Sequence, residues 1–456
     1  MKINIEKKEI KRKIIAKHLF EKKTDEIFEI NNIIYFGLGK KKEYNSLKLR
    51  EGISNLIKYI QKRNFDECSL NLNNDLIIKN IESTIKILIE TLILSKHENG
   101  LLKTKNNEKS KLKTFYIKTN EKVSNKTIEE SLIIANSINW AKDLINLPSN
   151  IITPENFVKE SKKRIKNVKI KILNRKEIIK NKLNLIEAVS RSSYNEPRFM
   201  IIEYKPKNHK NKKPYCLIGK GITFDTGGLS LKPSSFPGNF MKGMKCDMAG
   251  AASVVSVINI ITNLKLNKWI IGLIPLTENT IGGNSYKVDD VLISHSGLSV
   301  EIINTDAEGR LILADALSYS KKYAPEIIID IATLTGASLL AIGDRGACYM
   351  TNNNKLNSLF ENSAKENDEK VWELPLWEEY NDLLKSDVAD LSNVNNERGP
   401  GTIIGGLFLK NFVNEKTPWI HIDIGASAFV EKNLTLSKKG ATGICIKTLY
   451  DFLKNY

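Results

Sequence analysis

The chain has 456 residues, which is long enough for two or three domains. Of these residues, 41% are hydrophobic and 27% are charged, a composition typical of globular proteins. The segment Met1–Lys17 is charged throughout, so we expect no signal peptide, and we expect no membrane partner. The five cysteines are widely spaced, odd in number and without a C-x-x-C pair, which predicts reduced thiols in a cytoplasmic protein.

The net charge of +18 is unevenly distributed along the chain. Residues 1–213 contain 47 Lys and Arg against 25 Asp and Glu, whereas residues 214–456 contain 23 against 27. A basic front half can bind nucleic acid through its phosphates. The excess, however, is nearly all Lys among abundant Asn and Ile, which favours an AT-rich genome that fills surface positions with lysine. DNA binding is therefore the less favoured of the two interpretations.

The first part of the chain alternates between strand-like and helix-like segments. Strands are predicted at 33–39, 68–72 and 114–118, and helices at 47–60 and 77–95. We therefore predict a small, basic and divergent N-terminal α/β domain over residues 1–125.

A long helix is predicted to connect this domain to the rest of the chain, over residues 126–147. Thr127 and Glu130 have the spacing of a capping box, and the helix is expected to end before Pro148.

The remaining residues, 148–456, alternate regularly between strands and helices. Strands are predicted at 168–173, 198–204, 215–219, 269–275, 300–303, 326–331 and 419–424, and helices at 155–165, 249–264, 310–323, 376–384, 402–413 and 443–455. This alternation predicts a second α/β domain with a mostly parallel central sheet, in which ligands bind at the carboxyl ends of the strands.

Three charges lie between a predicted strand and a predicted helix in the stretch 302–317. Asp306 and Glu308 are two residues apart, so in an extended segment both carboxylates point the same way. Two carboxylates aimed at one point repel unless a cation lies between them, and a divalent metal is the usual one. The alternative is a helix N-terminus whose acids suit its dipole, but this does not explain Arg310.

A glycine-rich loop after the strand 215–219 adds further candidates. It contains Lys220, Asp225 and Lys232, but it lacks the G-x-x-x-x-G-K-[ST] spacing of a nucleotide-binding loop. Asp247 begins the next helix, where the simplest interpretation is a helix cap.

Together, four acids at the ends of strands and helices form an oxygen-rich set: Asp225, Asp247, Asp306 and Glu308. Zn, Mn, Mg or Co ions suit such a set, and four carboxylates are enough for two metals. The five histidines form no H-E-x-x-H pair, which excludes the one-zinc helix motif.

The motif N-T-D-A-E-G-R-L at 304–311 resembles the signature of the leucyl aminopeptidases, the cytosol aminopeptidase family of dinuclear metallopeptidases. Four further motifs resemble that family in the same order: G-K-G-I-T-F-D-T-G-G at 219–228, M-K-C-D-M-A-G-A at 244–251, A-T-L-T-G-A at 332–337 and H-I-D-I-G at 421–425. The resemblance covers the chain from Asn139 onward and is faint before it.

The resemblance implies that Asp225 and Glu308 bridge two divalent ions, Mn or Zn, with Mg or Co as alternatives. Lys220 and Asp247 complete the tighter site, and Asp306 completes the more exchangeable one. A lysine ligand must be neutral, as burial beside two dications allows.

The resemblance also implies the catalytic groups. Lys232 stays charged and polarises the carbonyl of the peptide bond that is cleaved. Arg310 holds a bicarbonate ion that acts as general base, with backbone groups of Ala307, Gly309 and Leu334 completing its binding site.

The pocket for the N-terminal side chain of the substrate is implied to be apolar and open, favouring Leu and Met. It is lined by Met244, Thr333, Gly336, Gly425 and Ala428.

The resemblance finally implies a cytoplasmic homohexamer that removes N-terminal residues from peptides. Two alternatives are an inactive structural hexamer, disfavoured because all expected ligands are present, and another two-metal hydrolase such as a phosphoesterase, disfavoured by the lysine ligand and the absence of histidine ligands.

Overall fold

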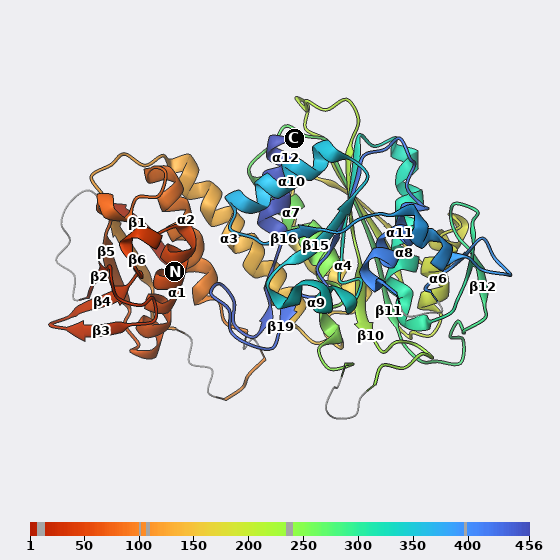
Figure 1. Cartoon of the computed structure of the whole chain (residues 1–456), viewed down its shortest axis with the longest axis horizontal. Coiled ribbons are helices and arrows are strands. Elements are labelled where there is room, and N and C mark those ends of the chain that lie inside the picture. The colour runs from red at the N-terminus through yellow and green to blue at the C-terminus, as the bar shows by residue number, and fades with distance from the viewer. Residues whose placement is uncertain (7–13, 100–101, 106–109, 234–239, 396–398) are drawn as a thin grey trace. The chain divides into compact units, whose positions relative to one another are not determined.

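The computed structural model describes residues 1–6, 14–99, 102–105, 110–233, 240–395 and 399–456, which form two compact units (Figure 1). Unit 1 comprises Met1–Asn139 and Glu431–Gly440, and unit 2 comprises Trp140–Val430 and Ala441–Tyr456. The division falls within the helix predicted to connect the domains. The sequence-based boundaries did not anticipate that a late segment, Glu431–Gly440, groups with the N-terminal unit.

In the described part of unit 1, six strands form one sheet in the order β1-β6-β5-β2-β4-β3, parallel except at the β3–β4 pair. The strands are β1 (Lys2–Glu6), β2 (Ile15–Leu19), β3 (Ile27–Ile30), β4 (Ile33–Gly37), β5 (Glu67–Asn71) and β6 (Thr114–Lys118). Two helices, α1 (Ser46–Lys62) and α2 (Ile81–Lys96), pack against each other. Ile53, Leu56 and Ile60 of α1 are fully buried, at the spacing that places apolar side chains on one helix face.

The long helix α3 (Asn125–Asn146) begins earlier than predicted. The backbone N–H of Thr127 donates to Ser124 Oγ at 3.1 Å, so Ser124 caps the helix. The predicted capping box that starts at Thr127 is therefore wrong.

The central sheet of unit 2 has the order β16-β15-β18-β14-β9-β11-β8-β7 among the described residues, and β10 also pairs with β11. Its strands are β7 (Lys169–Leu173), β8 (Arg198–Tyr204), β9 (Tyr215–Gly219), β10 (Gly221–Asp225), β11 (Ile270–Asn279), β14 (Ile327–Ala332), β15 (Ala347–Thr351), β16 (Val371–Glu373) and β18 (Trp419–Asp423). The middle strands β18, β14, β9 and β11 are parallel, and antiparallel pairs occur toward both edges. The predicted two-domain α/β fold with a mostly parallel central sheet is confirmed.

Helices cover both faces of this sheet, as Figure 1 shows. They are α4 (Pro154–Arg164), α5 (Arg175–Lys180), α6 (Asn184–Ser190), α7 (Ala249–Asn263), α8 (Glu308–Ser320), α9 (Ala337–Ile342), α10 (Asn354–Glu366), α11 (Gly401–Lys410) and α12 (Ile446–Asn455). On β11, Ile271 and Leu273 belong to the core that includes α8, whereas a Cβ on Gly272 would lie 2.6 Å from Ile258 of α7. Because successive strand residues face opposite sides, α7 and α8 lie on opposite faces.

Met244–Asn263, which includes α7, is long and apolar enough to cross a membrane by length and composition alone. The helix contacts β9, β11 and β14, and 89% of its apolar window is buried within the protein. Its apolar character is therefore accounted for by its place as a core helix. The five cysteines are free and buried.

One predicted strand lies elsewhere than expected. The segment 300–303 was predicted to join the central sheet, but β13 (Ser299–Glu301) pairs instead with β12 (Val291–Ile293) and β17 (Leu391–Ser392) in a separate small sheet. A further pair, β19 (Phe429–Val430) and β20 (Gly440–Ala441), flanks the segment Glu431–Gly440.

Candidate metal centre

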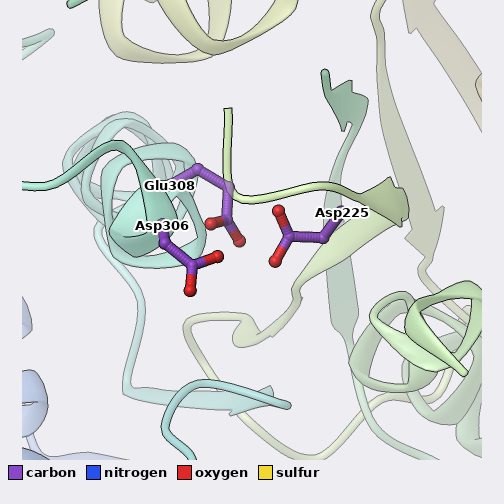
Figure 2. Close-up of side chains that lie close together, drawn as sticks. All are labelled: Asp225, Asp306 and Glu308. Atoms are coloured by element: carbon purple, nitrogen blue, oxygen red, sulfur yellow. The ribbon is translucent and has the colours of Figure 1, made fainter. Parts of the chain in front are cut away.

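Three carboxylates meet near one end of the central sheet (Figure 2). Asp225 is the last residue of β10, Asp306 lies in a 3-10 turn just before α8, and Glu308 is the first residue of α8. One oxygen from each carboxylate lies within 4.8 Å of the other two, and the side chains point toward a common space. The structure thus brings together three of the predicted ligands from two separate segments of the chain.

The local geometry of Asp306 and Glu308 differs from the prediction. They were expected in an extended segment at the end of a central strand, but Thr305–Ala307 form a helical turn and α8 begins at Glu308. The Asn304 side chain accepts the backbone N–H of Asp306 at 2.7 Å and stabilises this turn. Asp306 and Glu308 therefore do not lie on one side of an extended strand, as predicted, although both carboxylates do face Asp225.

Each of two lysine side chains contacts two of the acids, and the proximity of Asp225, Asp306 and Glu308 joins these contacts into one network. Lys232 Nζ lies 2.7 Å from Asp225 Oδ2 and 2.5 Å from Asp306 Oδ1. Lys220 Nζ lies 2.8 Å from Asp247 Oδ1 and 3.1 Å from Glu308 Oε1, and it donates to the Thr333 carbonyl at 2.7 Å. All five residues predicted as metal ligands, together with Lys232, therefore belong to one set of contacts.

Negative charge exceeds positive charge in this network, because four carboxylates share two ammonium groups. Burial opposes the charge of Lys220 and Lys232, but the neighbouring carboxylates outweigh it and raise the pKa of both ammonium groups. Burial, reinforced by Asp225 and Glu308, raises the pKa of Asp306 to about 7. Burial likewise raises the pKa of Asp247 well above its ordinary value. Added positive charge would relieve this excess.

The Asp247 side chain supplies an independent sign that a cation fits here. Its Oδ1 atom faces Lys220 and accepts the Thr333 hydroxyl at 2.7 Å, but its Oδ2 atom is buried and has no hydrogen-bond partner among the residues that the structure describes. Buried carboxylate oxygens are normally paired, so an unpaired one next to other acids suits a metal ligand. Four carboxylates and one amine nitrogen are donors that divalent ions accept.

The contact between Lys220 and α8 explains a glycine of the N-T-D-A-E-G-R-L motif. A Cβ atom on Gly309 would lie 2.4 Å from Lys220 Cε and 2.6 Å from Lys220 Nζ. Lys220 therefore crosses directly over the first turn of α8 to reach Glu308, and any larger residue at position 309 would displace it.

A second glycine shapes the turn that follows Asp225. Gly227 has φ +89°, in the left-handed region that favours glycine, and its backbone N–H donates to Asp225 Oδ1 at 2.8 Å. The turn thus fixes the carboxylate that it follows.

Arg310 is buried beside the carboxylate network. Its Nη1 atom donates to the Asn393 carbonyl at 2.8 Å, and its guanidinium carbon lies 5.9 Å from the centre of the Phe408 ring. Burial lowers the pKa of Arg310 to about 10, while Glu308 and Asp423 favour its charged form. The guanidinium therefore remains a fixed cation at neutral pH.

The residues expected to accompany Arg310 lie around it. Ala307 and Gly309 flank Glu308 at the start of α8. Leu334 and Arg310 both lie next to Gly405. A Cβ atom built on Gly405 would be 3.1 Å from Leu334 Cδ2 and 3.6 Å from Arg310 Nη2, so the two side chains lie close to each other. The backbone N–H of Leu334 already donates to Asp423 Oδ1 at 3.2 Å.

The residues predicted to line the side-chain pocket come from three segments. Thr333 and Gly336 follow β14, Gly425 and Ala428 follow β18, and Met244 lies in the turn before α7. The first two segments touch, since a Cβ atom on Gly425 would lie 2.5 Å from the Thr335 carbonyl oxygen. Thr333 also reaches the third segment through its hydrogen bond to Asp247.

The sequence-based prediction missed Asp423, the last residue of β18. Its fully buried carboxylate accepts the Thr335 hydroxyl at 2.7 Å, the Leu334 N–H at 3.2 Å and the Gly425 N–H at 2.9 Å. It thereby joins the loops that follow β14 and β18. Its position at the end of an apolar strand was the available signal.

Two asparagines were also missed. The buried Asn393 amide accepts the Ile303 N–H at 2.8 Å and donates to the Asn304 carbonyl at 2.7 Å, which holds the segment that leads to Asp306. Asn279, the last residue of β11, donates to Asp225 Oδ1 at 2.8 Å. Neither lies in a motif of charged residues.

Comparison with known proteins agrees with this arrangement. Residues 139–450 match the model of the cytosol aminopeptidase family, catalytic domain. The chain belongs to the cytosol aminopeptidase family. This membership confirms the predicted resemblance to that family.

Two relatives show how far the similarity to other cytosol aminopeptidase family members extends. A probable cytosol aminopeptidase of Geotalea uraniireducens (strain Rf4) is 40% identical over 333 residues, which cover 72% of this chain and 66% of the relative, just under two thirds. A probable cytosol aminopeptidase of Histophilus somni (strain 129Pt) is 37% identical over 436 residues, covering 94% of this chain and 86% of the relative.

A solved structure is similar over nearly the whole chain. The bottromycin maturation enzyme BotP superimposes with a TM-score of 0.87 at 26% sequence identity, covering 97% of this chain and 99% of BotP. The structure of BotP in complex with Mn gives a TM-score of 0.86 at the same identity.

Proposed function

We propose that the chain is a leucyl aminopeptidase that removes N-terminal residues, preferably Leu or Met, from peptides with two divalent ions per subunit. One observation carries the proposal above all. The carboxylates of Asp225, Asp306 and Glu308 converge within 4.8 Å, with the Lys232 ammonium in contact with two of them, in a chain of the cytosol aminopeptidase family.

The ligand assignment is the one that the family resemblance implies, and the contacts among these residues support it. Asp225 and Glu308 would contribute to both metal sites, Lys220 and Asp247 to one site, and Asp306 to the other. Divalent ions held there would lower the pKa of a bound water and accept the free α-amino group of the substrate. Lys220 must lose its proton to act as a ligand, so metal loading at this site releases a proton. We propose Mn or Zn as the native ions, and the Mn complex of the similar BotP supports Mn.

Lys232 supplies the cation that polarises the substrate carbonyl. Its neighbours Asp225 and Asp306 raise its pKa, so the ammonium keeps its charge at neutral pH. A fixed ammonium beside the reacting carbonyl favours the transition state, in which negative charge develops on the carbonyl oxygen.

Arg310 supplies a second fixed cation. We propose that its guanidinium binds a bicarbonate ion, which acts as the general base. Backbone groups of Ala307, Gly309 and Leu334 complete this binding site. Arg310 Nη1 donates to the Asn393 carbonyl at 2.8 Å, which restrains the direction of the guanidinium and supports this proposal. The Leu334 N–H already donates to Asp423 Oδ1 at 3.2 Å.

Met244, Thr333, Gly336, Gly425 and Ala428 are proposed to surround the N-terminal side chain of the substrate. Two glycines and one alanine leave room for a branched or unbranched apolar side chain, and these five residues bring no charge to pair with Asp, Glu, Lys or Arg. We further propose that the enzyme is cytoplasmic, in line with the relatives' designation as cytosol aminopeptidases. The family resemblance is the ground for proposing a homohexamer.

A panel of aminoacyl p-nitroanilides tests the proposed specificity. The Leu and Met substrates should have the highest kcat/KM, the Asp and Lys substrates should be slower by about 10-fold or more, and N-acetyl-leucine p-nitroanilide should not be cleaved. Cleavage of the acetylated substrate, or a preference for Asp, would overturn the proposal.

A further inference from the structure

The buried amide of Asn279 lies at the point where the elements of the metal centre meet. Asn279 is the last residue of β11 and has no exposed surface. Its Nδ2 atom lies 2.8 Å from Asp225 Oδ1, 3.0 Å from the Thr305 carbonyl oxygen and 3.3 Å from Glu308 Oε2. One amide group therefore contacts two carboxylates that come from different segments of the chain.

We infer that Asn279 is a positioning residue that orients Asp225 and Glu308 for metal binding. This inference rests on the proposed function, because it concerns the ions that those carboxylates would hold. Residues that hydrogen-bond metal ligands typically change metal affinity by about 10–100-fold when they are removed.

The chemistry of the amide suits this task. The NH₂ group offers two hydrogens without a charge to three acceptors. One hydrogen reaches Asp225 Oδ1, and the other lies between the Thr305 carbonyl oxygen and Glu308 Oε2, so the amide contacts both carboxylates without competing with a cation for the site. A lysine here would add a third ammonium, and an aspartate would add a fifth carboxylate to a network in which four already share two lysines.

The oxygens that Asn279 does not contact point the other way. Asp225 Oδ2 faces Lys232, and Glu308 Oε1 faces Lys220. Asn279 thus restrains one oxygen of each carboxylate and fixes the direction of the other toward the interior of the network. Without the amide, both side chains would gain rotational freedom that a metal must then remove.

Tyr286 provides a matched control. Its hydroxyl donates at 2.7 Å to the Thr305 carbonyl oxygen, the same acceptor that Asn279 contacts, and it is also buried. No described hydrogen bond joins the Tyr286 hydroxyl to Asp225 or Glu308. Tyr286→Phe therefore weakens the same turn while it leaves the carboxylates' hydrogen bonds intact.

The test is the dissociation constant of Mn²⁺ for the full-length protein, stripped with a chelator and titrated by calorimetry at fixed pH. We expect Asn279→Ala to weaken Mn²⁺ binding by about 10–100-fold. The Mn²⁺ affinity of Asn279→Ser, which keeps one donor, should lie between that of Asn279→Ala and that of the wild type. Tyr286→Phe should bind Mn²⁺ as tightly as the wild type. Thermal unfolding of each metal-free variant reports its stability separately, and Asn279→Ser serves if Asn279→Ala does not fold.

Two results would overturn the inference while leaving the proposed function intact: Mn²⁺ affinity unchanged in both Asn279 variants, or affinity lowered equally in Tyr286→Phe. A wild-type protein that binds no Mn²⁺ and no Zn²⁺ would instead contradict the proposed function, and the inference with it.

Discussion

In unit 1, Arg50 and Glu90 face each other at 3.3 Å, so one buried cation meets one buried anion. In unit 2, four carboxylates share two lysines, and Asp247 Oδ2 is buried with no hydrogen-bond partner in the described part of the chain. Both arrangements remove charge from water at a considerable cost in free energy. The pair in unit 1 is balanced within the protein, whereas the network in unit 2 has an excess of negative charge that a ligand can neutralise.

This difference indicates what each unit's buried charge contributes. Arg50 and Glu90 do not belong to the carboxylate network, so this pair is expected to affect folding. An unbalanced network keeps binding capacity for a cation, at the expense of stability in the absence of that cation. Substitutions in the carboxylate network should therefore change metal content or catalysis, whereas those of the Arg50–Glu90 pair should change stability alone.

The largest effect is expected when a shared carboxylate of unit 2 is neutralised. Glu308→Gln keeps the shape of the side chain but removes the charge that faces Lys220. Bound metal per subunit and kcat/KM should fall together, with kcat/KM lower by at least about 10³-fold. Full metal content measured by mass spectrometry, with normal activity, would contradict this role for Glu308.

A smaller effect, confined to catalysis, is expected for Lys232→Ala. This substitution removes a cation that contacts Asp225 and Asp306, so metal binding should be retained while kcat falls by about 10²–10³-fold. Lys287→Ala is the matched control, since that lysine is exposed and pairs only with Asp290 in the described contacts, at 3.1 Å. Wild-type turnover in Lys232→Ala would remove Lys232 from the mechanism.

In unit 1 the effect should be on stability alone. Arg50→Met leaves the buried Glu90 without its guanidinium partner and should lower the free energy of unfolding by about 3–5 kcal/mol. The unfolding transition in urea measures this, and Arg50→Met/Glu90→Leu should recover much of the loss. The kcat/KM of the folded variants should stay within about twofold of the wild type. A larger loss of activity in these variants would contradict the assignment of the Arg50–Glu90 pair to stability alone.

The smallest effect is expected for the exposed lysines of unit 1. Lys41 pairs with Asp75 at 2.7 Å, but both side chains are about half exposed, so Lys41→Ala should change stability by less than about 1 kcal/mol.

Duplex DNA binding by the lysine-rich unit 1 should be absent at physiological salt if the lysine excess reflects base composition. A steep salt-dependent affinity for duplex DNA would show instead that the basic surface has a function.

The sequence predicted the elements whose apolar pattern matches their burial. The strands β9, β14 and β18 and the helices α7 and α8 were found within a few residues of the predicted bounds, because each is buried on the faces that its pattern indicates. The strand β10 was not predicted. Its glycines indicated a loop, but pairing with the fully buried β11 stabilises it as a strand.

The prediction of the site was limited by what neighbouring residues in the sequence can indicate. Charged residues within dense motifs, such as Asp306 and Glu308, could be recognised, but their helical turn could not, since it depends on the capping of Asp306 by Asn304 and on the position of Asn393. Asn279 is an uncharged residue at a strand end, and only the three-dimensional pairing with Asp225 reveals its contact.

The most direct test of the central claim is the hydrolysis of leucine p-nitroanilide by the purified chain, first stripped of metal and then supplied with Mn²⁺ or Zn²⁺. If the carboxylate network of unit 2 holds catalytic metals, activity should be absent after stripping, return on metal addition and disappear when the substrate amine is acetylated. Activity that is unchanged by stripping, or its absence despite bound metal, would contradict the account.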